Sequence, residues 1–266
     1  MTTEKLNDKY AAILNNVVNF PPARSDQGVT PNPFIRSSLF GLVKKGEAKF
    51  VDAKLIATQG DHTLLYSGKE LNQANLDVWL CLQKIWIEND CKPVECDSKE
   101  ILKTIGLSYA KGDKLWLKDK IEDLVKATLL FEFDNGRTGF TGRLIKELEW
   151  TGDYHTFKFD LDNKLKNMFG CNDFTYLDFK KRREIRSDLG TWLFSYYRSH
   201  KELFPIHISK LYLYSGSSSE LKEFKRSLKN AHEELLKVGY IQAYEINKQG
   251  IVFVTRNLQK ELTINP

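Results

Sequence analysis

Two segments of this 266-residue chain repeat one order of expected elements, a long helix, two shorter helices and then β-strands that include a hairpin. That order is typical of a helix-turn-helix whose β-hairpin, the wing, closes over one side. The sequence therefore predicts an α+β fold of two tandem winged-helix domains (helix-turn-helix plus β-hairpin wing) with an N-terminal arm. We expect the arm at residues 1–60, the first domain at residues 61–168 and the second at residues 169–266.

The N-terminal residues are the least regular part of the chain. Residues 6–18 fit a short helix that Pro21-Pro22 ends. The polar stretch from Ala23 to Pro33 is typical of a loop or mobile arm, and the apolar residues 34–40 are expected to pack on a domain. Residues 62–66 fit a short strand.

The first repeat starts with a helix whose apolar residues recur at helical spacing. Asp97 or Ser98 is expected to cap the next helix, and Gly106 to end it. The strands that follow predict a β-meander. We expect helices at residues 72–88, at residues 100–105 and from Asp113 or an earlier residue, and strands at residues 129–133, 138–149 and 155–159.

The second repeat predicts a helix over residues 179–199, a brief helix over residues 210–214, a helix over residues 219–238 and a hairpin over residues 240–255. Ser209 is expected to cap the brief helix, and Ser217-Ser218-Ser219 to cap the longer one. The longer helix has an apolar stripe with steps of three and four residues, which indicates its buried face. The stripe consists of Leu221, Phe224, Leu228, Ala231, Leu235 and Val238.

The positive charge of the chain is concentrated in its C-terminal part. The whole chain has 40 Lys and Arg against 35 Asp and Glu, a net charge of +5. Residues 164–266 have 18 Lys and Arg against 11 Asp and Glu, a balance of +7, whereas residues 1–163 have 22 against 24, a balance of −2. This asymmetry favours a polyanionic partner, and a solubilising surface is the alternative.

The candidate DNA-binding residues lie mainly on the helix at residues 219–238. A helix that follows a short helix and a tight turn enters the major groove, where Arg and Lys donate to guanine, and its N-terminal end favours a phosphate. The candidates there are Ser218, Ser219, Lys222, Lys225, Arg226 and Lys229, joined by Lys248 in the wing and by Arg182, Arg183 and Arg186 at the entrance to the domain. In the first repeat they are Lys111, Lys114 and Lys118, where Asp113 and Asp119 dilute the charge. A solvated helix face is the alternative for all of these lysines.

Several other classes of protein are disfavoured. No apolar run approaches 18 residues and the first 20 residues lack a secretory pattern, so we expect a cytoplasmic protein. The four cysteines form no C-x-x-C pair and the five histidines no metal-binding motif, so we expect neither a metal nor a cofactor. Residues 67–70 lack the flanking residues of a phosphate-binding loop. Tyr196-Tyr197 is expected to pack on a helix, and nothing argues for an enzyme.

Several stretches resemble TrfA-like plasmid replication initiators. Residues 36–40 (RSSLF) are similar to the family's RSALF segment, and residues 66–71 (YSGKEL) with 76–79 (LDVW) to its Y-T-G-x-x-L…V-W stretch. The family's C-terminal winged helix is resembled by residues 199–205 (SHKELFP), 214–219 (YSGSSS), 231–236 (AHEELL) and Gly239. The resemblance runs from about residue 32 to residue 256.

This resemblance implies a DNA-binding function. Such initiators bind repeated sequences, called iterons, at a plasmid origin through two winged helices, of which the C-terminal one makes the main contact. The N-terminal one serves dimerisation, and a homodimer is in equilibrium with the monomer that opens the origin. A host initiator ATPase, the replicative helicase and the sliding clamp are expected partners. Residues 37–40 resemble the end of a clamp-binding Q-L-x-L-F segment without its Gln, and plain packing is the alternative.

Two other functions stay open at this point. One is a winged-helix transcription regulator, such as an autorepressor, which uses the same surface on a single operator. The other is a DNA-nicking enzyme, which is disfavoured because the His-x-His pair that holds a metal beside a nucleophilic tyrosine is absent from the sequence.

Overall fold

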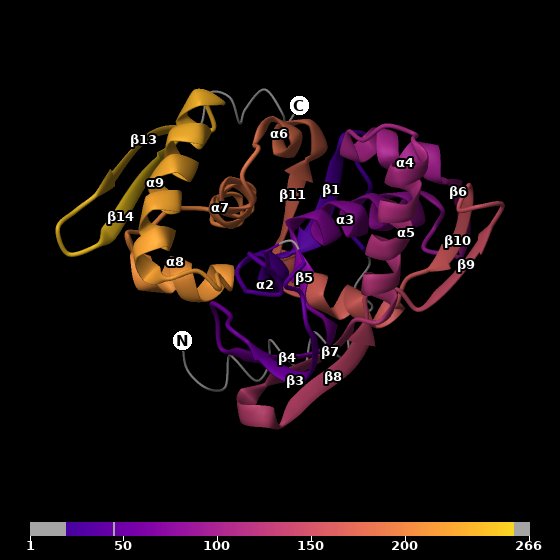
Figure 1. Ribbon diagram of the computed structural model, residues 1–266. Coiled ribbons are helices and arrows are strands. Elements are labelled where there is room, and N and C mark those ends of the chain that lie inside the picture. The colour runs from indigo at the N-terminus through magenta and orange to yellow at the C-terminus, as the bar shows by residue number, and fades with distance from the viewer. Residues whose placement is uncertain (1–19, 45, 258–266) are drawn as a thin grey trace.

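The computed structural model describes residues 20–44 and 46–257, which form a mixed α+β fold (Figure 1). The expected helix at residues 6–18 lies outside the described residues. The first elements are β1 (Gln27–Pro31), α2 (Asn32–Ile35), β2 (Phe40–Gly41), β3 (Phe50–Ile56), β4 (His62–Lys69), β5 (Leu71–Asn72) and α3 (Gln73–Glu88). Then come β6 (Val94–Asp97), α4 (Ser98–Ile105), α5 (Lys111–Val125), β7 (Thr128–Phe133), η1 (Asp134–Gly136), β8 (Thr138–Arg143), β9 (Glu147–Thr151), β10 (Thr156–Asp160) and η2 (Asn163–Asn172). The last are β11 (Phe174–Asp178), α6 (Phe179–Glu184), α7 (Asp188–Arg198), β12 (Ile206–His207), α8 (Ile208–Ser215), α9 (Leu221–Lys237), β13 (Ile241–Ile246) and β14 (Ile251–Arg256).

The two repeats share their strand order. In the first, β6 leads into α4 and α5, and β9 and β10 complete a sheet of order β6-β10-β9. In the second, β12 leads into α8 and α9, and the sheet has the order β12-β14-β13. The side chain of Asp97 caps α4 and that of His207 caps α8, in each case by accepting from the backbone N–H two residues on. Both helices end at a left-handed glycine, Gly106 with φ 81° and Gly216 with φ 63°.

The expected β-meander of the first repeat is wrong, because its middle strand belongs to two sheets. Strand β8 pairs with β7 in a four-stranded sheet of order β3-β4-β7-β8, whereas β9 pairs with β10. Leu144 and Ile145 between them are both fully buried. Since alternate residues of a strand face opposite sides, two consecutive buried residues mark where the chain leaves one sheet for the other. The Leu144 N–H bonds to Ala127 beside β7, and the Lys146 N–H bonds to Asp160 of β10.

The single helix expected at residues 179–199 is also wrong. The chain breaks into α6 and α7, and Ser187 caps α7 by accepting from the Gly190 N–H at 3.1 Å. Glu234 of α9 accepts hydrogen bonds from the Arg186 N–H at 2.5 Å and from the Ser187 hydroxyl at 2.5 Å. This carboxylate therefore stabilises the break and connects α9 to the start of α7.

Residues 23–33 are not a loop throughout. Strand β1 pairs antiparallel with β11, from Gln27 opposite Asp178 to Pro31 opposite Phe174, and all five of its residues are buried. A Cβ at Gly28 would lie 2.6 Å from the Cβ of Leu80, so glycine lets β1 approach α3. The sequence did not predict this strand, because its polar residues and glycine show no alternation of apolar and polar residues.

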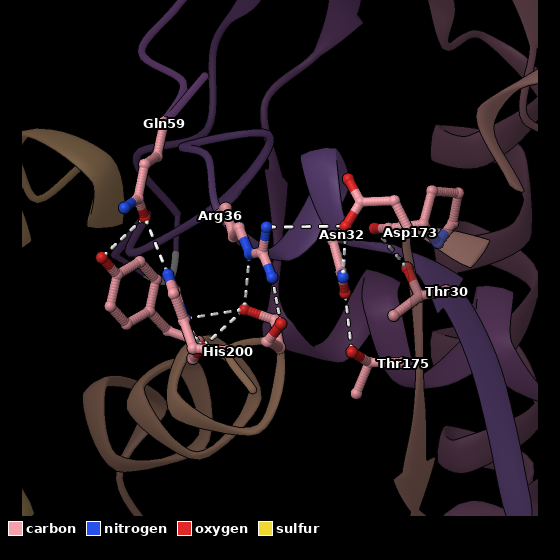
Figure 2. Close-up of polar contacts among 10 residues, drawn as sticks. Thr30, Asn32, Arg36, Gln59, Asp173, Thr175 and His200 are labelled. Carbon is pink, nitrogen blue, oxygen red and sulfur yellow. Dashed lines mark hydrogen bonds and ion pairs between the residues drawn. The ribbon is translucent and has the colours of Figure 1, made fainter. Parts of the chain in front are cut away.

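Arg36 and Gln59 form hydrogen bonds with the residues directly after α7 (Figure 2). The Arg36 guanidinium donates to the Ser199 hydroxyl at 2.9 Å and to the Ser199 carbonyl, and lies 3.5 Å from the Asp173 carboxylate. Asn32 donates to the same carboxylate at 2.7 Å. On the other side of Arg36, the Gln59 amide oxygen is 3.1 Å from the His200 ring nitrogen. The N-terminal segment thus bonds to the chain at Asp173, directly before β11, and at Ser199, directly after α7.

One hydrophobic cluster runs through both repeats. It contains Phe34 and Trp79, whose ring centroids are 5.3 Å apart, together with Trp192 and Leu228 of the second repeat. Residues 34–40 were expected to pack on a domain, and this is confirmed, since Leu39 and Phe40 are only 2% and 1% exposed. The interpretation of residues 37–40 as a clamp-binding segment is wrong, because a partner cannot contact side chains buried in the core.

A buried ion pair between the repeats gives a stability prediction. Arg182 of α6 lies 2.5 Å from Asp77 of α3, and their side chains are 1% and 29% exposed. Replacing Asp77 by Asn leaves a buried guanidinium without its counter-charge, so we expect the free energy of unfolding to fall by about 2–4 kcal/mol. The more exposed pair of Lys54 and Glu70, at 2.6 Å, is the control, and Lys54→Met should cost less than about 1 kcal/mol. Equal losses in urea unfolding would contradict this account.

Candidate nucleic-acid interface

Helix α9 has one buried face and one basic face. Phe224, Leu228, Ala231 and Leu235 are at most 1% exposed, as the sequence predicts, and the helix contacts α7 and β13. Leu221, at the first turn, is 43% exposed, so the expected stripe begins one step later. Because buried residues occupy one side of the helix, its exposed positions form a continuous opposite surface.

The four basic residues predicted on α9 are all exposed. Their spacing of i, i+3, i+4 and i+7 places them on one face of the helix. Arg226 pairs with Glu223 at 2.6 Å, and its side chain is still 73% exposed. The four residues are Lys222, Lys225, Arg226 and Lys229. We call this set the α9 basic face.

A groove separates the α9 basic face from the tip of the β13–β14 hairpin. Its volume is about 520 Å³, and Lys225, Arg226 and Lys229 line it on the helix side. Lys248 lines it on the hairpin side, with Asn247 and Gly250 beside it. The structure therefore brings four of the predicted DNA-binding residues to one hollow, and Lys222 lies on the same helix face outside the lining.

His207 fixes the hairpin beside α8, and sequence reasoning missed it. Its Nε2 donates to the Gln249 carbonyl in the hairpin turn at 2.9 Å, and its Nδ1 accepts from the Ser209 N–H at 3.2 Å. The helix cap was expected at Ser209, so that prediction is wrong by two residues. A histidine directly before a short helix was the available signal, but its contact with the hairpin turn spans 42 residues.

The three serines before α9 do not cap it. The N-cap is Glu220, without a side-chain hydrogen bond, so the expected serine cap is wrong. The Ser217 and Ser219 hydroxyls lie 2.9 Å from each other, and the Ser219 carbonyl accepts from Tyr212 of α8 at 2.8 Å. These bonds shape the turn between α8 and α9. Ser218 is exposed there, and its contact with a phosphate stays a prediction.

The three arginines Arg182, Arg183 and Arg186 near the start of the second repeat differ in exposure. Arg182 is 3% exposed and donates to Gln73 and Ser195 besides its pair with Asp77. Its predicted phosphate contact is therefore wrong, because its donors are turned into the protein. Arg183 donates to the Lys103 carbonyl at 3.3 Å, near the end of α4, and Arg186 is exposed. Their phosphate contacts stay predictions.

Helix α5 repeats part of this surface in the first repeat. Lys111 is exposed, and the Lys114 ammonium lies 5.0 Å from the centre of the Tyr109 ring. Lys118 pairs with Glu122 at 2.8 Å, and its side chain is 22% exposed. The hydrogen bond with Glu122 raises the pKa of Lys118. The three predicted lysines thus lie on one helix, but neighbouring carboxylates reduce the free positive charge.

Tyr196 and Tyr197 pack inside the protein, as expected. They are 3% and 2% exposed, and burial raises the pKa of both hydroxyls. Within residues 20–44 and 46–257, no three His, Cys, Asp or Glu side chains cluster in a way that suits a metal ion. Over the same residues no helix is both long and apolar enough to span a membrane.

The fold is shared with proteins of known structure. Domains 2 and 3 of RctB superpose with a TM-score of 0.62 and 11% identity, over 86% of this chain and 99% of that one. The Pi initiator protein, solved in complex with iteron DNA, gives a TM-score of 0.50 and 12% identity, over 75% of this chain and all of that one. At such identities the likeness concerns the fold. No curated protein matches the chain in sequence.

Residues 144–256 match the family model described as TrfA protein. The match starts where the chain leaves the four-stranded sheet and includes β9, β10 and every element of the second repeat. The resemblance to TrfA-like initiators that the sequence predicts is thereby confirmed, through this segment of the chain.

The buried face of α9 gives a pH prediction. His232 donates through Nδ1 to the Leu228 carbonyl at 2.7 Å and accepts from the Tyr197 hydroxyl at 2.8 Å. Burial lowers the pKa of His232 to about 4 from its ordinary value of 6.5. Because the unfolded chain then takes up a proton first as pH falls, the folded state loses stability between about pH 6.5 and pH 4.

We expect this histidine to account for a loss of roughly 2 kcal/mol between pH 7 and pH 5. Urea unfolding of the wild type and of His232→Gln at both pH values measures it. His200, whose pKa burial also lowers, is present in both proteins, so the difference isolates His232. The same pH dependence in both proteins would contradict the prediction.

Proposed function

We propose that the protein is a plasmid replication initiator that binds iterons at the plasmid origin through two tandem winged helices. Residues 61–168 and 169–266 are the two winged-helix domains in this proposal, and the second makes the main DNA contact. The protein has no catalytic activity, acts in the bacterial cytoplasm, and helps to open the origin and to recruit host replication proteins. The match to the TrfA protein family and the shared fold with an initiator solved on iteron DNA support it.

The groove between α9 and the β13–β14 hairpin carries the proposal. A helix of this kind enters the major groove, where an Arg can donate two hydrogen bonds to guanine O6 and N7. Arg226 is the candidate for that contact, since it is exposed and lies between two lysines that line the groove. Lys248 lines the opposite wall and is our candidate for a contact with a phosphate of the same duplex.

The two repeats suit a site with two parts. Figure 1 shows α9 and its hairpin on one side of the molecule and α5 with β9 and β10 on the other, with α7 and α3 between them. In our proposal α9 and α5 contact two successive parts of one iteron, and α5 makes the auxiliary contact. The first domain also forms a homodimer in equilibrium with the monomer, and the host initiator ATPase and the replicative helicase bind the active form.

Footprinting on tandem repeats tests this function against the alternatives. An initiator should protect several adjacent repeats and distort a neighbouring A·T-rich segment. Protection of a single palindromic operator would favour a transcription regulator instead. Incubation with supercoiled DNA and Mg²⁺ completes the test, since a nicked product would contradict a protein without catalytic activity.

Arg226 should determine sequence preference. Replacing Arg226 by Ala removes the donors to a base edge, so we expect specific binding to weaken by about 1–3 kcal/mol and the preference to relax at one position. Binding to the selected site and to random duplexes at fixed salt measures the effect. Equal losses on both kinds of DNA would remove this role from Arg226.

Lys248 should contribute affinity without sequence preference. Lys248→Ala is expected to weaken binding to every sequence alike and to lower the slope of log K against log salt by about one. Lys237, exposed on the last turn of α9 and outside the groove lining, is the matched control, and Lys237→Ala should leave the slope unchanged. If the two variants behave alike, Lys248 makes no phosphate contact.

A further inference from the structure

Helices α5 and α9, the last helices of the two repeats, can be aligned through their buried residues. On α5, Leu117, Ile121 and Leu124 are fully buried, at steps of four and three residues. On α9, Leu228, His232 and Leu235 are fully buried at the same steps. Each α5 residue therefore corresponds to the α9 residue 111 positions later. Phe224, Leu228 and Ala231 are buried at the same steps and would give an offset of 107. The glycines that end the preceding helices, Gly106 and Gly216, are 110 residues apart, and this favours the offset of 111.

The exposed faces then correspond position by position. The α9 basic face has its counterpart at α5 residues 111, 114, 115 and 118, again at spacings of i, i+3, i+4 and i+7. Three of the four positions hold lysine on both helices. The fourth holds Arg226 on α9 and Leu115 on α5. The two faces thus differ at the position that we assign to the reading of a base.

Leu115 is exposed on an otherwise basic face. Its exposed fraction is 43%, whereas Leu117, two residues on, is fully buried. A single exposed leucine is ordinary on a protein surface. This one, however, replaces the arginine of the other repeat, and it lies between Lys114, which is near the Tyr109 ring, and Lys118, which Glu122 holds. An apolar side chain at such a position suits an apolar group on the partner.

The major groove offers one such group. Thymine carries its C5-methyl group on the major-groove edge, and apolar side chains contact it there, whereas guanine presents O6 and N7 to arginine. We propose that Leu115 contacts a thymine methyl and makes α5 specific for an A·T pair, while Arg226 makes α9 specific for a G·C pair. The inference rests on the proposed function, since it requires both helices to enter the major groove of one site.

Replacement of thymine by deoxyuridine tests this contact directly, because it removes only the methyl group. In the bound site each thymine is replaced in turn, and the dissociation constant is measured. We expect one position, outside the part of the site that responds to Arg226→Ala, at which binding by the wild type weakens about fourfold, the value of one buried methyl group.

Two variants of the same position sharpen the test. Leu115→Ala should bind the thymine site about as weakly as the wild type binds the deoxyuridine site, with no further loss on the deoxyuridine site. Leu115→Arg should shift the preference at that position from thymine toward guanine. Leu107, 38% exposed in the turn between α4 and α5, is the matched control, and Leu107→Ala should keep the full response to deoxyuridine. Circular dichroism verifies that each variant is folded.

The possible failures can be told apart. If the wild type shows no sequence-specific binding, the proposed function and this inference fail together. A second outcome is that the wild type binds specifically and Arg226→Ala weakens that binding, but no single deoxyuridine replacement weakens binding more than the others. In that case only the role of Leu115 is overturned. A deoxyuridine response that persists unchanged in Leu115→Ala overturns it equally, because another side chain then contacts the methyl group.

Discussion

The contact between α9 and α7 determines where the basic face points. Leu228 and Leu235 fill the hydrophobic core, and between them His232 bonds to Tyr197 of α7 at 2.8 Å. At the far end of the contact, Glu234 accepts from the Ser187 hydroxyl that caps α7. A helix held by apolar packing and by two directional bonds has little freedom to rotate about its axis. The α9 basic face, on the opposite side, is therefore presented in one orientation.

Contacts between distant segments also fix the rest of the molecule. Strand β1 pairs with β11, Arg36 bonds to the end of α7, and Arg182 pairs with Asp77 of α3. Strand β11 is thus bonded to β1, and α6 is bonded to α3. The hydrophobic core is continuous between the two repeats. A protein built in this way can hold α5 and α9 at a fixed separation. The two-part DNA site that we propose requires such a fixed separation.

Much of this arrangement could be predicted from the sequence, because local patterns encode it. The stripe on α9 predicts which residues are buried, and the glycines at 106 and 216 mark the ends of α4 and α8. The exposed positions of the α9 basic face follow from the same periodicity.

The rest depends on contacts between distant residues, which local patterns do not encode. Arg182 and Arg183 cannot be distinguished in the sequence, but Asp77, 105 positions earlier, holds Arg182 inside the protein. Strand β1 is a strand because β11 lies beside it, and its own residues lack strand alternation. In the sequence, Leu144 and Ile145 look like two more apolar residues of one long strand. Only the structure shows that the chain passes from one sheet to another at these residues. The hairpin contact of His207 has no local signal at all.

The central claim is that the α9 basic face, with the hairpin opposite, recognises a DNA sequence. Selection of binding sites from random duplexes by the full chain tests it most directly, in parallel with the Arg226→Ala variant. The account predicts that the wild type enriches one motif and that the variant loses information at a single position of it. Enrichment of no motif, or of an unaltered motif by the variant, would contradict the account.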